Sequence, residues 1–275
     1  MNKNKFLSGK VAAYPHVVWS VLFIVFPLIF VIYFAFTTPG GAFTLENIYA
    51  LGDHKETFVL SVSLSLIATF FCFIVGYPLA YLLAQVEPKK QRILIMLLML
   101  PMWTNLLIRT YSMMALMDDA GIINSLLKAL NLGTVRMIGT KAAVVFGMAY
   151  DFFPYMVLPI FTSISKIDKR VIEAAADLGS NPLRVMTKVV LPLSASGIIS
   201  GITMVFVPSI STFYISQKLG GGTFDLLGDA IERQFQNVNT YNVGAAISLV
   251  MMILVLTSLW VMNRFTDSEE REVRE

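Results

Sequence analysis

The chain has 275 residues, of which 56% are apolar and 14% are charged. Soluble domains carry about 25% charged residues, so this composition excludes an ordinary soluble domain and a disordered chain. It favours an integral membrane protein. The net charge of +3 is too small to indicate nucleic-acid binding and is informative only by its location along the chain.

The metal-ligating residue types are scarce. The lone cysteine, Cys72, excludes a disulfide framework and a site made of several thiolates. His16 and His54 lie in separate segments and do not form a histidine-rich site. We therefore expect no metal and no cofactor bound to this chain.

Long apolar runs separated by charged segments predict an all-α membrane protein with six transmembrane helices, because a bilayer core needs about 20 apolar residues per helix. The runs are too long and too weakly alternating for the strands of a barrel. The expected spans are 17–36, 58–84, 93–116, 142–164, 195–215 and 243–262. This divides the chain into an N-terminal tail (1–16), a first transmembrane helix (17–36), a five-helix core (58–262) and a C-terminal tail (263–275) that we expect to be solvated.

Basic residues are distributed unequally between the two sides of these spans. Fourteen Lys and Arg residues lie in the two tails and in the second-to-third and fourth-to-fifth loops, against six in the other loops. The positive-inside rule then places both termini in the cytoplasm. The longer outer segments, 37–57, 117–141 and 216–242, are expected to hold short helices or re-entrant pieces.

Two charged residues, Arg109 and Asp151, fall inside predicted spans, where an unpaired charge is costly. They could neutralise each other across neighbouring helices, which is the interpretation we prefer. Alternatively, Asp151 could bind an ammonium group.

The loop 166–192 differs from the others because it contains two amphipathic helical pieces joined at Gly179. We call it the elbow. Gly179 fits the residue that ends a helix in the left-handed backbone conformation. Asn181 fits the N-cap of the second helical piece, and Pro182 fits its first helical position. The apolar faces are Val171, Ile172, Ala175 and Leu178 in the first piece, and Leu183, Met186 and Val190 in the second. The elbow could insert into a partner's groove or lie on lipid headgroups.

A resemblance to a known family favours the first of these alternatives, insertion into a partner. Glu173-Ala174-Ala175, Gly179, Val189 and Leu191-Pro192 together resemble the EAA motif of permease subunits of bacterial ABC importers, with Val189 where the pattern usually has Ile. The resemblance implies a type I (MetI-like) permease fold whose coupling helices dock on a separate ATPase. The coupling residues that it implies are Glu173, Ala174, Ala175, Asp177, Gly179, Pro182, Leu191 and Pro192.

Further stretches are similar to spermidine/putrescine permeases of the same family. They are Gly76-Tyr77-Pro78, Pro101 to Arg109, Glu173 to Gly179, and Phe213 to Ser216 running into Gly220-Gly221. This similarity implies a second permease subunit, two ABC ATPase subunits that bind ATP and Mg, and an extracytoplasmic polyamine-binding protein.

The chain has no apparatus of its own for driving or catalysing a reaction. No phosphate-binding loop is present, since Gly220 to Gly222 are followed by Thr223 and Phe224 without a lysine. No cluster of catalytic residue types is visible either. We therefore expect a non-catalytic subunit.

A polyamine path needs aromatic faces and polar groups. The candidate path residues are Trp103, Asn105, Arg109, Tyr111, Tyr150, Asp151, Tyr155, Phe213 and Tyr214. The aromatic residues among them could instead belong to interfacial belts. Two other functions stay open: an ion-coupled secondary carrier that uses Asp151, and an ABC permease for another small solute.

Overall fold

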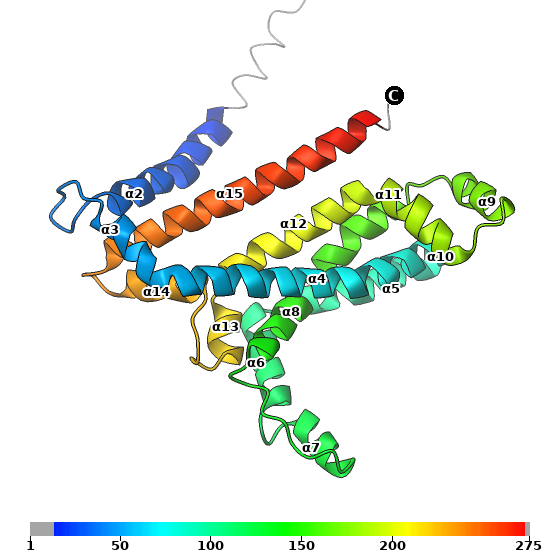
Figure 1. Ribbon diagram of the computed structural model, residues 1–275, viewed down its shortest axis with the longest axis horizontal. Helices are drawn as coiled ribbons and strands as arrows, with labels where there is room; N and C mark the ends of the chain where they lie inside the picture. The colour runs from blue at the N-terminus through cyan, green and yellow to red at the C-terminus, as the bar shows by residue number, and fades with distance from the viewer. Residues whose placement is uncertain (1–13, 273–275) are drawn as a thin grey trace, which may run out of the picture. The chain divides into compact units, whose positions relative to one another are not determined.

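The computed structural model describes residues 14–272, except for the side chains of residues 176 and 265–272. The described residues are helical apart from loops and one isolated antiparallel bridge between Thr37 and Phe43. They form two compact units. Figure 1 labels the helices. Unit 1 contains residues 14–55 and Ala230–Ile253, and unit 2 contains Glu56–Asp229 and residues 254–272.

Unit 1 begins with one long apolar helix, Tyr14–Ala35, which includes a π-helical turn at Val21–Val25 and continues as α2 (Phe26–Ala35). Two short helices follow, α3 (Glu46–Tyr49) and the 3-10 helix η2 (Ala50–His54). The unit also contains most of α14 (Leu227–Gln236) and the start of α15 (Tyr241–Glu272).

Two buried asparagines fix the carboxyl end of α2. Asn47 Nδ2 donates to the carbonyls of Ala35 at 3.1 Å and Thr37 at 2.9 Å, and Asn242 Nδ2 donates to those of Phe34 at 3.0 Å and Thr37 at 2.6 Å. These bonds satisfy carbonyls that a helix end leaves without partners. They also explain why residues 230–253 group with the N-terminal helix, whereas the sequence placed them in a core over 58–262.

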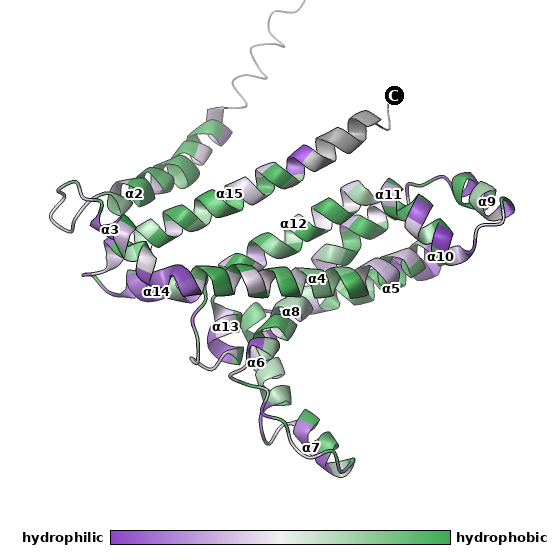
Figure 2. Cartoon of the chain, viewed as in Figure 1, coloured by the Kyte–Doolittle hydropathy of each residue, from purple (hydrophilic) through white to green (hydrophobic). Residues whose placement is uncertain are grey.

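Unit 2 holds the remaining helices in the order α4 (Lys55–Gln85), α5 (Pro88–Met99), η3 (Leu100–Trp103), α6 (Leu106–Met117), α7 (Ile122–Ala129), α8 (Lys141–Ile164), α9 (Lys169–Asp177), α10 (Pro182–Val185), η4 (Met186–Val190), α11 (Leu191–Leu193), α12 (Ala195–Ser211) and α13 (Tyr214–Leu219). Figure 2 shows hydrophobic residues along α4, α12 and α15, and hydrophilic ones along α14. The expected all-helical membrane protein is confirmed.

Four helices are long and apolar enough to cross a membrane, and two bent helix pairs bring the number to six if each pair is one span. The third expected span, 93–116, is not one straight helix. The chain bends by 92° between Pro88–Trp103 and Leu106–Ala129. Pro101 supplies no backbone N–H, and Thr104 and Asn105 adopt extended backbone conformations before α6 begins. The second bent pair, Pro182–Leu193 and Ala195–Ser211, turns by 72°.

The sixth span also differs from expectation at its end. Helix α15 continues to Glu272, past Met262 where the solvated tail was expected to start. A helix that is already formed extends without a new nucleation cost, which accounts for helix over a polar segment. The expected tails 1–16 and 263–275 lie partly outside the described residues, at 1–13 and 273–275.

Helices α8 and α12 pack closely against each other in unit 2, and glycine makes this approach possible. A Cβ atom added to Gly197 would lie 2.5 Å from Ser163 Cβ and 2.6 Å from the Pro159 carbonyl oxygen. One added to Gly201 would lie 2.9 Å from Met156 Sδ. Small residues let membrane helices approach in this way.

Gly197→Leu should therefore separate α8 from α12. We expect at least about a threefold loss of folded protein in the membrane, since overpacking typically costs about 1–3 kcal/mol. Quantitative immunoblotting of membranes and size exclusion of the detergent-solubilised protein would measure the amount of folded protein. Gly52→Ala is the matched control, because a Cβ there meets nothing within 4 Å. Normal levels of the Gly197→Leu protein would contradict the packing argument.

Candidate functional site

The first arm and the corner of the elbow (166–192) follow local capping rules. Gly179 has a φ of 76°, and the Ser180 amide donates to the Ala175 carbonyl at 3.3 Å, which is the hydrogen bond of a Schellman cap. At the other end of α9, Asp168 Oδ1 accepts from the Arg170 amide at 3.0 Å. The predicted C-cap is confirmed, and Asp168 is an N-cap that the sequence reasoning missed although Asp is a favoured N-cap residue.

The second arm is capped and anchored. Asn181 Oδ1 accepts from the Arg184 amide at 2.8 Å, and Pro182 opens α10, as predicted. Val185 and Val190 are buried in the cluster that contains Tyr77 and residues of α8. Pro192 lies in α11, and α12 begins at Ala195 after the bend. The second arm is therefore continuous with the packed interior of unit 2.

The apolar faces of the elbow are buried only in part. Ile172 and Ala175 pack against the core, whereas Leu178 is 88% exposed and Leu183 is 65% exposed. The two apolar faces that helical spacing predicts are therefore only partly in contact with the core, and Leu178 and Leu183, on either side of the turn at Gly179, lie on the surface of unit 2. Val171 is exposed as well, at 45%.

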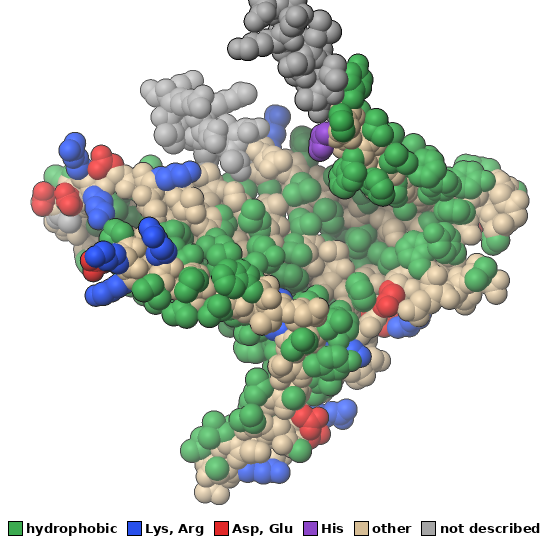
Figure 3. All heavy atoms as spheres, turned by 180° about the vertical axis from the view of Figure 1, so that it is seen from behind, with side chains coloured by type: hydrophobic (Ala, Val, Ile, Leu, Met, Phe, Trp, Pro, Cys, Tyr) green, Lys and Arg blue, Asp and Glu red, His purple; other side chains and the backbone are tan. Residues whose placement is uncertain are grey.

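Charged and small side chains complete this exposed surface. Glu173, Ala174 and Asp177 are exposed on α9. Figure 3 shows basic side chains gathered at the end of unit 2 that carries α9 and α10. They are the exposed residues Lys166, Lys169, Arg170, Arg184 and Lys188. The elbow thus presents two large apolar side chains within a charged rim, which is the composition of a protein-binding surface.

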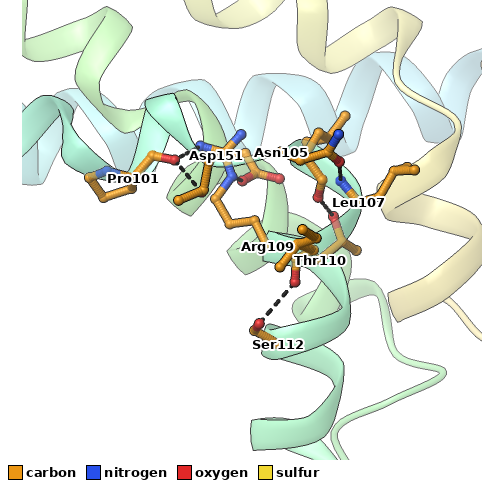
Figure 4. A network of polar contacts seen from close by, with 10 residues as sticks. Pro101, Asn105, Leu107, Arg109, Thr110, Ser112 and Asp151 are labelled. Atoms are coloured by element: carbon orange, nitrogen blue, oxygen red, sulfur yellow. Dashed lines mark hydrogen bonds and ion pairs between the residues drawn. The ribbon is translucent and has the colours of Figure 1, made fainter.

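A second polar feature lies inside unit 2. Arg109 on α6 and Asp151 on α8 form an ion pair, with Nε and Oδ1 2.5 Å apart (Figure 4). The Asp151 side chain is 1% exposed and that of Arg109 is 12% exposed. The interpretation that the two charges neutralise each other is confirmed. A pair this buried avoids the cost of an isolated charge in an apolar interior.

Arg109 also spans the break in the third apolar segment. Its Nη1 donates to the Pro101 carbonyl at 3.0 Å, on the other side of the 92° bend (Figure 4). Asn105 caps α6, since its Oδ1 accepts from the Leu107 amide at 2.8 Å. One guanidinium therefore joins the bend to α8. Asn105 makes a local bond within its own segment and is exposed.

The candidate aromatic residues are only partly assembled. Tyr111 and Tyr214 meet edge to face, with ring centroids 6.2 Å apart. The ring centroid of Tyr155 lies 6.4 Å from that of Phe152, which is on the same helix. All but Tyr214, which is half-buried, are exposed by more than a third, with Trp103 at 70%. The structure thus brings together two pairs of the predicted residues, Arg109–Asp151 and Tyr111–Tyr214.

The chain matches a family of known transport proteins over most of its length. Residues 11–272 match the model of the family "Binding-protein-dependent transport system inner membrane component". The chain is 36% identical over 264 residues to the spermidine/putrescine transport system permease protein PotB of Escherichia coli, covering 91% of this chain and 96% of PotB. It is 34% identical over 265 residues to PotB of Haemophilus influenzae, covering 93% of each.

Solved structures show the same fold. A chain of a bacterial ABC transporter that imports alginate superposes with a TM-score of 0.78 at 17% identity, covering 96% of this chain and 97% of that one. A chain of the MetNI methionine ABC transporter superposes with a TM-score of 0.58 at 17% identity, covering 82% and 99%. The predicted MetI-like permease fold is confirmed.

Apolar helices, a neutralised interior charge pair and an exposed elbow define a multi-pass membrane permease subunit of an ABC importer. The chain belongs to the family of binding-protein-dependent transport system inner membrane components.

Proposed function

We propose that this chain is the permease subunit of an ATP-driven importer of spermidine and putrescine. The observation that carries the proposal is the 36% identity to the Escherichia coli PotB permease over 96% of that protein's length. The alignment covers 91% of this chain, so it includes the bend and the elbow.

The permease would form half of the translocation pathway, and a second, different permease subunit would supply the other half. Two cytoplasmic ABC ATPase subunits would bind ATP and Mg, and an extracytoplasmic binding protein would deliver the amine. Both termini would be cytoplasmic, as the distribution of basic residues favours.

The elbow is the part of the chain suited to receive force from the ATPases. Its second arm is buried in the core through Val185 and Val190, while its corner exposes Leu178 and Leu183. Closure of the ATPases on nucleotide would move the corner, and the anchored arm would pass the movement to α12. Rocking of helices about a central site is a known class of such transitions.

The charge balance limits what this subunit can contribute to substrate binding. Because Arg109 neutralises Asp151, the Asp151 carboxylate is not free to bind an ammonium group. Exposed aromatic faces, including Trp103, Tyr111 and Tyr150, remain for cation–π contacts with ammonium groups. The second permease would then supply most of the negative charge.

Uptake by the reconstituted complex tests the proposal. Proteoliposomes that contain both permeases and the ATPases, with the binding protein outside, should accumulate radiolabelled spermidine only when ATP is enclosed. Excess unlabelled putrescine should compete, whereas glucose should not. Uptake that proceeds without the ATPase subunits would indicate an ion-coupled carrier instead, and an absence of amine uptake would indicate another solute.

A further inference from the structure

A lysine ammonium lies against two tyrosine rings in unit 2. Lys218 Nζ is 5.3 Å from the centroid of the Tyr111 ring and 5.7 Å from that of the Tyr214 ring. Tyr214 and Lys218 are four residues apart on α13 and share a face of that helix, while Tyr111 comes from α6. The two rings meet at 80°, so they form two walls around one cation.

The packing beneath these residues holds the two walls in place. Met113 and Met117 of α6 are buried in one cluster with Ile215 and Leu219 of α13. Tyr111 itself is 47% exposed, whereas Tyr214 and Lys218 are half-buried. The cation site is therefore built on a fixed helix pair and is open on the side of Tyr111.

The Lys218 side chain that lies against the two rings has the chemistry of the proposed substrate. The lysine side chain is a four-carbon chain that ends in a primary ammonium, and each end of putrescine or spermidine is the same group on a similar chain. A cation within about 6 Å of a ring centroid is attracted by the ring face. Neither ion pair found among the described residues includes Lys218, and its partners are the two rings and the Tyr111 hydroxyl, which is hydrogen-bonded to it.

We propose that Tyr111 and Tyr214 form a binding subsite for a primary ammonium group and that Lys218 fills it until a substrate ammonium displaces it. This inference rests on the proposed function, since it assigns a position to one end of the transported amine. Two ammonium groups do not share the site, because like charges at this distance repel. Lys218 therefore competes with the substrate and leaves the rings as the amine arrives.

Equilibrium binding of radiolabelled spermidine to the complete permease–ATPase complex in nanodiscs tests this directly. The binding protein is left out, so that its own affinity does not dominate. Lys218→Met removes the competing charge but keeps the length of the side chain, and it should lower Kd by about three- to thirtyfold. Tyr111→Leu with Tyr214→Leu should raise Kd by a similar factor, while the matched pair Tyr111→Phe with Tyr214→Phe keeps both rings and should bind nearly normally.

Tyr49→Leu is the control for a general effect of losing a tyrosine, because Tyr49 is 78% exposed and lies in unit 1. Size exclusion of each complex shows that it is assembled. If Lys218 merely ties α13 to α6, Lys218→Met would lower the yield of complex and leave Kd unchanged or raised, which overturns the proposal. Equal Kd values for the Leu and Phe pairs would overturn it too.

The two proposals fail in different ways. A wild-type complex that transports spermidine, with Kd unaffected by any of these variants, rejects the ammonium subsite and leaves the proposed function intact. A wild-type complex that neither binds nor transports spermidine rejects the proposed function, and the subsite is rejected with it.

Discussion

Gly179→Val should abolish substrate uptake while the protein remains in the membrane at close to its normal level. Gly179 has a φ of 76°, and a Cβ there would meet nothing within 4 Å. The cost of the substitution is therefore backbone strain alone, about 1–2 kcal/mol. The corner would relax by changing its backbone angle, which redirects Leu178 and the exposed face of α9. A partner that docks on this surface would lose its fit.

Uptake by cells that express the complete importer, together with immunoblotting of membranes, would measure this effect. We expect uptake to fall at least about tenfold and the protein level to change by less than about twofold, since strain of this size at an exposed turn leaves the core intact. Gly133→Val is the matched control, because Gly133 has a φ of 82°, has equally open surroundings and lies outside the elbow. Equal uptake in the two variants would refute a coupling role for the corner.

Glu173→Lys tests the same surface without backbone strain. Glu173 is exposed on α9, so reversing its charge should leave folding unchanged. It should nevertheless reduce uptake about as strongly as Gly179→Val, because a partner that docks there would meet a charge of the wrong sign. ATP hydrolysis by the assembled complex should become independent of the loaded binding protein. Wild-type uptake in this variant would contradict the docking role.

Local rules predicted the parts of the molecule that depend on neighbouring residues. The caps at Gly179 and Asn181 follow from residue preferences at helix ends, and both were correct. The Arg109–Asp151 pair was predictable for a different reason. These are the only interior charges of opposite sign in the predicted spans, and an apolar interior leaves them few partners.

Long-range packing accounts for what the sequence did not predict. A hydropathy pattern gives the length of the third span but not the size of its bend, which depends on the extended backbone at Thr104 and Asn105 as well as on Pro101. Helical spacing placed Leu178 and Leu183 on apolar faces, but spacing alone does not show which members of such a face meet the core. The approach of Lys218 to Tyr111 joins residues more than one hundred positions apart.

Removing one member of the interior ion pair should be more damaging than removing both. Arg109→Met leaves the Asp151 carboxylate 1% exposed and without its cation, and it also frees the Pro101 carbonyl at the bend. Breaking a buried pair in this way costs about 3–5 kcal/mol, whereas replacing both partners with apolar residues is often close to neutral. We expect Arg109→Met to reduce the folded protein at least about tenfold, and Arg109→Met with Asp151→Leu to recover most of that loss.

Membrane levels and thermal stability would be measured for Arg109→Met, for the double variant and for Asp151→Asn, which is the isosteric single change. Uptake by the double variant then separates the two roles that Asp151 could have. If the pair only holds α6 and the bend against α8, the restored protein should transport at a substantial fraction of the wild-type rate. If Asp151 also receives an ammonium group during transport, the restored protein should fold, assemble and hydrolyse ATP but take up no spermidine. Equal damage in the single and double variants would show that the pair is not a unit.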